Sequence, residues 1–241
     1  MPTSMFEKIV DDLTAIPRLH KFQLSLFKVN EPLMEPRLYQ FLELIREKLP
    51  NALPTITTNA SLLTDEHIQN LSKQGLAYLW ISFNDHRKDE YQKTMKLPFI
   101  RTVENLKNLH SIKKNGMFAS RVVLSRVGDG TPDDQGFVKW VNAEFPLFEA
   151  GVFQRGDWMG QVDNKSSQSH LDCGCKRWFE LSITATGTVA LCCMDGQAEH
   201  PIGDVSINSV LEIYNSQNYK KLRIDLDSRQ GIEFCKSCSF L

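Results

Sequence analysis

The cysteines are the feature that most limits what this sequence can fold into. All six lie between Cys173 and Cys238, in the stretches CGC, CC and CKSC, and the first 172 residues contain none. Thiols concentrated at one end of a chain indicate a local chemical use: disulfides, metal ligation or redox chemistry. The rest of the sequence helps to choose among these.

Composition and charge favour a metal over disulfides. Hydrophobic residues make up 41% of the chain and charged residues 24%, as in an ordinary globular protein, and the net charge of −1 comes with no basic block. The longest apolar run, AYLWISF, is far too short to span a membrane. The amino-terminal stretch MPTSMFEKIVDDL is acidic and amphipathic, unlike a signal or transit peptide. We therefore expect a cytoplasmic protein with reduced thiols, which binds neither nucleic acid nor membrane.

The hydrophobic pattern of residues 1–154 predicts strict alternation of helices and strands. Strands are expected at 22–29, 55–59, 78–83, 118–127 and 147–154, and helices at 4–16, 36–49, 64–74, 99–115 and from 131 onward. Such alternation predicts an α/β fold, in which a parallel sheet has its helices outside. The series begins with a helix, capped by Ser4 and Glu7, where such folds usually begin with a strand. We therefore expect a partial barrel without its first strand.

The character of the sequence changes after about residue 155. A glycine- and serine-rich linker is followed by two strands, FELSIT and TVALCC, around a turn at 185–187. Asn208 or Ser209, with Glu212, predicts the start of a helix, and a second helix is expected over 216–229. The sequence thus predicts two domains: a partial barrel at 1–155 and a small α+β domain with a β-hairpin at 156–241.

The predicted hairpin would carry a thiol at each of its ends. Cys173 or Cys175 precedes the first strand, and Cys192 or Cys193 ends the second. Antiparallel pairing brings these ends together, and the final C-x-x-C can complete a set of four thiolates. Four sulfur ligands suit either a structural zinc ion or a 4Fe–4S cluster. Two of the six thiols would then be spare.

The C-terminal sequence resembles the twitch domain, the short form of the SPASM domain that is appended to radical S-adenosylmethionine (SAM) enzymes. The resemblance rests on Cys175, Trp178, Leu181-x-Ile183, Gly187, the CCMD stretch from Cys192, Ile202-Gly203-Asp204, LEIYNS at 211–216 and Cys235-x-x-Cys238. It implies an auxiliary 4Fe–4S cluster. The ligands that it implies are Cys175, Cys192, Cys235 and Cys238, with Cys173 and Cys193 as alternates.

The front of the chain is similar to the partial barrel of radical SAM enzymes. NEPLMEPRL at 30–38 resembles that family's GGEPLL-type strand end, and TTNASLLT at 57–64 its TNG-type strand end. The resemblance implies that Glu31 contacts the amino group of SAM and that Asn59 and Ser82 lie at strand ends facing it. It also implies that Arg121 pairs with the SAM carboxylate.

One part of the family pattern is missing from the sequence. The C-x-x-x-C-x-x-C loop that binds the SAM-cleaving cluster is absent, since no cysteine precedes Cys173. In the family this loop follows the first barrel strand, which the pattern also lacks. We therefore expect an N-truncated or degenerate radical SAM protein, for which SAM remains a possible cofactor but a doubtful one.

Several functions remain open at the level of sequence. The resemblance implies an oxidoreductase whose full version modifies a small-molecule or peptide substrate by SAM-dependent radical chemistry, for example by oxidising an alcohol, with an electron donor as a possible partner. The alternative is a non-catalytic iron–sulfur protein, or a zinc-stabilised binding scaffold.

Overall fold

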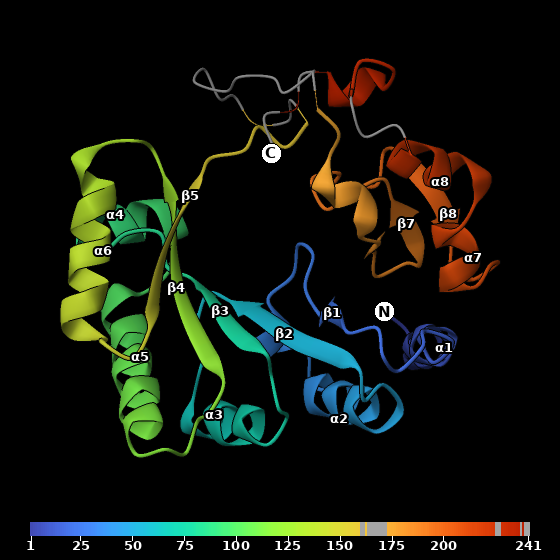
Figure 1. Cartoon of the computed structure of the whole chain (residues 1–241). Coiled ribbons are helices and arrows are strands. Elements are labelled where there is room, and N and C mark those ends of the chain that lie inside the picture. Colours follow the sequence, from blue (N-terminus) through green and yellow to red (C-terminus); the bar gives the residue numbers. More distant parts are fainter. Residues whose placement is uncertain (160–161, 163–172, 225–227, 237, 239–241) are drawn as a thin grey trace. The chain divides into compact units, whose positions relative to one another are not determined.

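Five parallel strands form the predicted sheet, in the order in which they follow one another along the chain (Figure 1). They are β1 (Phe22–Ser25), β2 (Ala52–Thr58), β3 (Tyr78–Ser82), β4 (Arg121–Gly128) and β5 (Glu149–Gln154). The computed structural model describes the whole chain except residues 160–161, 163–172, 225–227, 237 and 239–241. Sequential order is what helical crossovers between neighbouring parallel strands produce.

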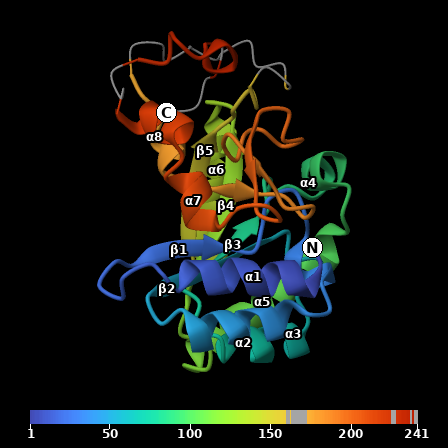
Figure 2. The same cartoon turned by 90° about the vertical axis from the view of Figure 1, so that its right-hand side faces the viewer.

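Helices follow each of the first four strands. They are α2 (Leu38–Lys48), α3 (Asp65–Ser72), α4 (Lys88–Met95), α5 (Phe99–Lys114) and α6 (Pro132–Glu144), with a 3-10 turn η1 (Pro32–Met34) before α2. Figures 1 and 2 show α2, α3 and α5 together on one side of the sheet. Helix α4 was not expected, because Tyr91 is its one buried residue and its sequence carries no apolar stripe.

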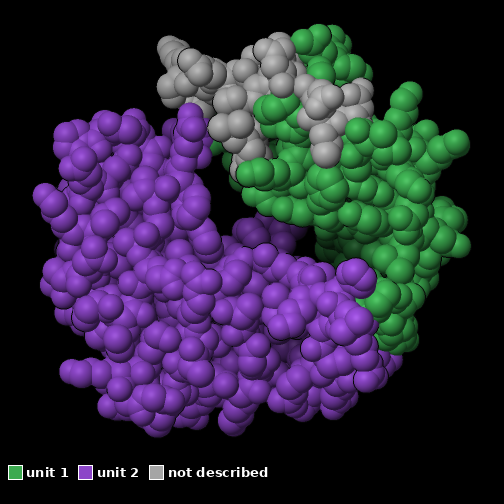
Figure 3. Space-filling model, in the orientation of Figure 1, with its two compact units in different colours: residues 1–17, 156–241 green, residues 18–155 purple. Residues whose placement is uncertain are grey.

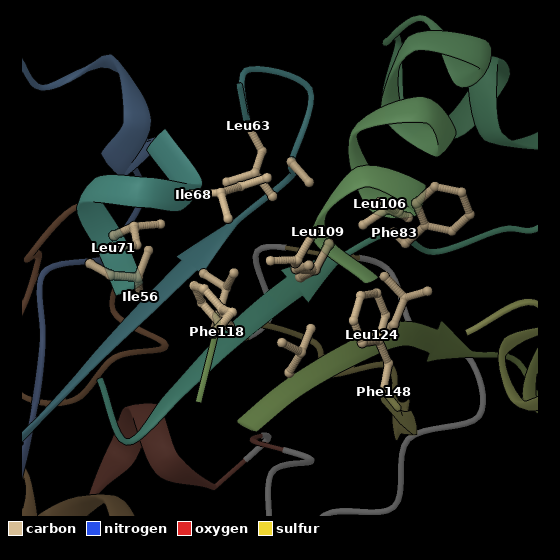
Figure 4. Close-up of a cluster of buried hydrophobic side chains, with 14 of the residues drawn as sticks. Ile56, Leu63, Ile68, Leu71, Phe83, Leu106, Leu109, Phe118, Leu124 and Phe148 are labelled. Carbon is tan, nitrogen blue, oxygen red and sulfur yellow. The ribbon is translucent and has the colours of Figure 1, made fainter. Parts of the chain in front are cut away.

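The main core lies between the sheet and these helices (Figure 4). Ile56, Leu79 and Leu124 are fully buried on three neighbouring strands, and Phe83 stacks on Trp140 of α6. Full burial of one such side chain contributes about 1.5–3 kcal/mol. Alternate residues of a strand face opposite sides, so Trp80 and Ser82 belong to the other face of the sheet, where both are half-buried.

A three-stranded antiparallel sheet forms the centre of the second unit. Its strands are β6 (Ser182–Ile183), β7 (Thr188–Ala190) and β8 (Pro201–Asp204). The hairpin of β6 and β7 was predicted, but β8 was not, because three of the four residues in PIGD are typical of turns. Around the sheet lie η2 (Lys176–Phe179), α7 (Val210–Tyr214), α8 (Gln217–Ile224) and η3 (Glu233–Cys235). Ser209 and Glu212 form the predicted capping box at the start of α7.

The amino-terminal helix α1 (Thr3–Leu13) is part of this second unit. The units comprise residues 18–155 and residues 1–17 with 156–241 (Figure 3). Ile9 packs in a cluster with Val189 of β7 and Ile213 of α7, and the Asp12 carboxylate accepts a 3.0 Å hydrogen bond from the backbone N–H of Val210. The sequence had placed this helix with the barrel, because only tertiary contacts reveal that its apolar face packs on residues near position 200.

The start of α1 also differs from the prediction. Pro2 occupies the N-cap position, and no side chain caps the helix. Ser4 therefore lies inside the first turn, and the capping box that we expected from Ser4 and Glu7 does not form.

Candidate functional site

The first candidate site is a pocket at the carboxyl ends of β1, β2 and β3. It has a volume of about 280 Å³. The residues that line it are Phe27, Asn30, Glu31, Thr57, Thr58, Asn59 and Ser82. Ligands of open parallel sheets bind outside this edge, because the loops there gather polar groups from several strands. Three predicted residues, Glu31, Asn59 and Ser82, are brought together in this pocket.

Glu31 is held in one orientation by its neighbours. Its Oε1 accepts hydrogen bonds from the Thr58 hydroxyl at 2.7 Å and from the backbone N–H of Leu33 at 3.2 Å. Its Oε2 accepts one from the backbone N–H of Asn59 at 2.9 Å. An ionised carboxylate offers about four acceptor positions, so these three bonds leave capacity for a cationic donor in the pocket. The arrangement suits an ammonium group.

The turn after β2 is shaped by Asn59 and Ala60. The Asn59 side chain accepts a 2.9 Å hydrogen bond from the backbone N–H of Ser61, and Ala60 adopts a φ of 60°. The left-handed region is sterically unfavourable for an L-residue such as alanine, whereas glycine adopts it readily. The Ala60 residue is fully buried within the main core.

Arg121 is not brought to the pocket. It is the first residue of β4 and pairs in register with Tyr78, whereas Ser82 pairs with Ser125 four residues farther along. At about 3.3 Å per residue, this separation is about 13 Å along the strand. The Arg121 side chain is 66% exposed, and its guanidinium forms a bidentate ion pair with Glu149 at 2.7 and 2.8 Å. Arg121 therefore does not line this pocket, and its predicted contact with the SAM carboxylate stays a prediction.

A buried ionic network adjoins the loops after β3 and β4. The Arg126 guanidinium donates to Asp85 at 3.0 Å, to Asp134 at 2.7 Å and to Asp129 at 3.3 Å. Burial acts to raise the pKa of Asp85, but hydrogen bonds from Arg87 and the charges of Arg87 and Arg126 outweigh it and lower that pKa to about 2. The sequence analysis missed this network; its only signal was a charged residue in a strand, Arg126, followed by acids.

The second candidate site is the cysteine cluster. Cys175, Cys192, Cys235 and Cys238 are each 6–7% exposed, whereas Cys173 and Cys193 are less buried. Cys175 and Cys235 belong to the same apolar cluster as Trp178, Leu191 and Tyr219. The thiols of Cys175, Cys192 and Cys238 are near enough to Cys235 for their charges to disfavour its ionisation. The four cysteines that the resemblance implied are thus neighbours and are the buried ones.

Burial controls the ionisation of these thiols. The pKa of Cys192 is raised to about 11 and that of Cys235 to about 12, mainly by burial and to a smaller extent by the charges of the neighbouring cysteines. The backbone N–H groups of Asp195 and Met194 act in the opposite direction on Cys192. Four neighbouring thiols in an apolar environment become thiolates only when a cation offsets their charge, so this donor set fits an iron–sulfur cluster or a zinc ion.

The described side chains do not form a closed metal site. Within the described part of the chain, no three His, Cys, Asp or Glu side chains come close enough together to hold a metal ion. The fold brings the four cysteines into one region, and binding would require them to close onto the metal.

The loop after Cys192 is held by a buried acid that the sequence analysis did not single out. The Asp195 carboxylate, fully buried, accepts hydrogen bonds from the backbone N–H groups of Glu199 at 2.8 Å and of His200 at 3.0 Å. The His200 ring stacks on Phe234 at 3.8 Å, just before Cys235. The CCMD stretch was the signal for this role of Asp195.

Comparison with known proteins gives a family match for the C-terminal part of the chain. Residues 173–239 match the SPASM family, described as an iron–sulfur cluster-binding domain. No curated protein matches the sequence.

Solved structures match nearly the whole chain. BtrN, crystallised with AdoMet and 2-DOIA, is 16% identical at a TM-score of 0.69, over 100% of this chain and 81% of that one. Streptococcus suis SuiB bound to the precursor peptide SuiA is 13% identical at 0.68, over 99% and 63%. AnSMEcpe with bound AdoMet is 12% identical at 0.58, over 92% and 70%.

These comparisons confirm the predicted fold over nearly the whole chain and the SPASM-type nature of residues 173–239. In the described residues, no helix is long and apolar enough to cross a membrane.

Proposed function

We propose that this chain, which has the fold of radical SAM enzymes and a SPASM-type domain, holds an auxiliary 4Fe–4S cluster on Cys175, Cys192, Cys235 and Cys238, and that it serves SAM-dependent radical oxidation only together with a SAM-cleaving cluster that its own thiols do not bind. The observation that carries the proposal is the burial of these four neighbouring thiols in the segment that matches the cluster-binding family. When bound, the cluster would supply a one-electron centre or a surface that orients the substrate.

The pocket at the sheet edge is the proposed site for the methionine part of SAM. Glu31 would accept hydrogen bonds from the SAM amino group, because its carboxylate is already oriented by Thr58 and Asn59. Ser82 and the Asn59 side chain would line the same pocket. Arg121 has no part in this proposal.

The substrate would be a small molecule or a peptide, and an electron donor would be a partner. Structural neighbours are seen with both kinds of ligand: BtrN with AdoMet and 2-DOIA, and SuiB with a precursor peptide. We place the protein in the cytoplasm, where thiols stay reduced and are available as metal ligands.

An anaerobic reconstitution of the 241-residue chain tests the proposal. We expect about four iron and four sulfide per chain, as one 4Fe–4S cluster requires. We also expect weak SAM binding and no 5′-deoxyadenosine above a no-protein control after reduction, because these residues contain no C-x-x-x-C-x-x-C to leave an iron open for SAM. Reproducible deoxyadenosine formation, or SAM binding near the micromolar range, would contradict the second expectation.

A zinc-stabilised or non-catalytic iron–sulfur scaffold is the second candidate. Four cysteine sulfurs form structural zinc sites as well as cluster sites, so the donor set fits zinc as well as it fits a 4Fe–4S cluster. About one zinc per chain, with no iron or sulfide retained after reconstitution, would select the zinc scaffold and reject the cluster.

A further inference from the structure

Arg229 is a buried charged residue outside the proposed ligand set. It is 1% exposed, which makes it one of the largest fully buried side chains of the protein. Its Nε donates to the carbonyl of Cys173 at 3.1 Å, and its Nη2 donates to the carbonyl of Gly174 at 3.1 Å. Because burial of a charge is costly unless hydrogen bonds compensate it, this placement is a strong local constraint.

These bonds join two distant parts of the chain. Cys173 and Gly174 directly precede the proposed ligand Cys175, whereas Arg229 lies six residues before Cys235. The guanidinium therefore fastens the segment that carries the first ligand to the segment that carries the last two.

The backbone between Arg229 and Cys238 places the charge close to the thiols. The N–H of Ile232 donates to the carbonyl of Arg229, that of Cys235 to Ile232, and that of Cys238 to Cys235, at 3.0, 2.9 and 3.3 Å. These backbone bonds link Arg229 through Ile232 to Cys235, and the Arg229 charge acts on the Cys235 thiol in the direction that favours its ionisation.

A positive charge at this point has a defined effect on a bound cluster. Four thiolates around a 4Fe–4S core carry a net negative charge, which grows by one unit when the core takes up an electron. A buried cation favours the more negative state, and the low local dielectric strengthens the effect. Charge close to a cluster is one of the properties that set its reduction potential.

We propose that Arg229 is a positioning residue that raises the reduction potential of the auxiliary cluster. The inference rests on the proposed function, since it needs a cluster on Cys175, Cys192, Cys235 and Cys238. The redox step is a one-electron reduction of the bound cluster by an external donor, in which no bond forms or breaks.

Arg177 provides a matched control. It also lies near the cluster, where the charges of Cys193 and Cys175 act on it. Its side chain is 30% exposed and pairs with Glu180 at 2.7 Å, whereas Arg229 is 1% exposed. Because solvent screens an exposed charge more than a buried one, loss of Arg177 should change the potential much less than loss of Arg229.

The test is a redox titration of the reconstituted full chain with dithionite, followed by electron paramagnetic resonance. Iron and sulfide are measured first, so that a wild-type protein without a cluster refutes the proposed function before Arg229 is tested. We expect Arg229→Gln, which keeps donors but loses the charge, to shift the midpoint to a more negative potential. Arg229→Lys should stay close to wild type, and Arg177→Gln should shift little.

The other outcomes also decide the question. Cluster retention in Arg229→Lys with loss in Arg229→Gln would support a role for the charge. An unchanged midpoint potential in Arg229→Gln would overturn the proposal, because the charge would then have no effect on the cluster. Loss of the cluster from both Arg229 variants would also overturn it, because the guanidinium would then act only through its shape.

Discussion

At the scale of single residues, burial separates the cysteines into two groups. Four thiols lie in or beside an apolar cluster that contains Trp178 and Tyr219, and two lie nearer the surface. A buried thiol without a metal is a small apolar side chain, so its exchange for serine adds a polar group to the core as well as removing a ligand. The two groups should therefore respond differently to substitution.

The first prediction compares one cysteine from each group. Cys235→Ser should abolish the bound cluster and loosen the domain, because it removes a sulfur ligand and leaves a buried hydroxyl at a cost of about 1–3 kcal/mol. Cys173→Ser, at a less buried position, should keep most of the iron. Iron and sulfide analysis after anaerobic reconstitution measures the difference. Equal iron contents in the two variants would contradict the ligand assignment.

At the scale of elements, the network around Arg126 joins the loops after β3 and β4. Arg126 and Asp85 are both buried, so each needs the other to compensate its charge. Removal of one partner from a buried pair typically costs about 3–5 kcal/mol. The carboxyl edge of the sheet, where the pocket lies, should depend on this pair for its order.

The second prediction concerns Asp85 and pH. Asp85→Asn should lower the free energy of unfolding by about 3 kcal/mol at neutral pH. The pKa of Asp85 is about 2 in the folded protein and about 3.9 in an unfolded chain, so its contribution is complete above pH 4 and is lost as the pH falls toward 2. Urea unfolding at several pH values should show the gap between wild type and variant closing below pH 4.

Asp133→Asn is the control for this experiment. Asp133 pairs with Arg87, but both side chains are more than 40% exposed, so its loss should cost less than about 1 kcal/mol. If the difference in the free energy of unfolding between wild type and Asp85→Asn stays the same at low pH, the role of the ionised pair is refuted.

The third prediction concerns the docking of α1. Ile9→Ala should destabilise the second unit by about 2–4 kcal/mol, because Ile9 is buried against Val189 and Ile213. Amide hydrogen exchange should show faster exchange in β7 and α7, with little change in the sheet of residues 18–155. Glu7 is exposed on the same helix, so Glu7→Ala should change neither the stability of the second unit nor the exchange in β7 and α7. Faster exchange confined to the parallel sheet would contradict the assignment of α1.

At the scale of the whole molecule, the two units differ in what holds them together. Residues 18–155 have a large apolar core of their own, whereas the clusters formed by the described apolar residues of the second unit are smaller. A small core gains most from a metal, and metal binding then becomes part of the folding free energy.

The fourth prediction follows from this difference. Removal of the metal by a chelator should lower the unfolding temperature of the second unit and leave that of residues 18–155 nearly unchanged. Scanning calorimetry of the full chain should therefore show one shifted and one unshifted transition. A single transition that moves as a whole would contradict independent stabilisation of the two units.

The fifth prediction concerns cluster uptake and pH. Ligation requires thiolates, and the pKa values of Cys192 and Cys235 are about 11 and 12 in the metal-free protein, so binding must release protons. Cluster uptake should therefore become more favourable as the pH rises from 6 to 9. Reconstitution yields across this range, with proton release measured in weak buffer, would check it; an uptake independent of pH would refute it.

Much of this protein could be predicted from local pattern. The five strands alternate with helices, and the apolar period of each segment fixes which face it buries, so the parallel order follows from the crossover rule. Ser209 with Glu212 formed the expected capping box because such a cap depends only on neighbours within one turn. The grouping of Glu31, Asn59 and Ser82 also followed, because the carboxyl ends of parallel strands meet at one edge.

Other features were decided only by the tertiary structure. Arg121 belongs to a predicted strand, but the end of the strand at which it lies depends on register, which local sequence does not encode. Helix α1 shows an apolar face, but nothing in its sequence says that the face packs on β7 and α7. The sequence by itself determined the alternating sheet and the set of thiols, because short-range periodicity and ligand chemistry are local. Which residues share the pocket, and which buried charge accompanies the thiols, depended on contacts between segments far apart in the chain.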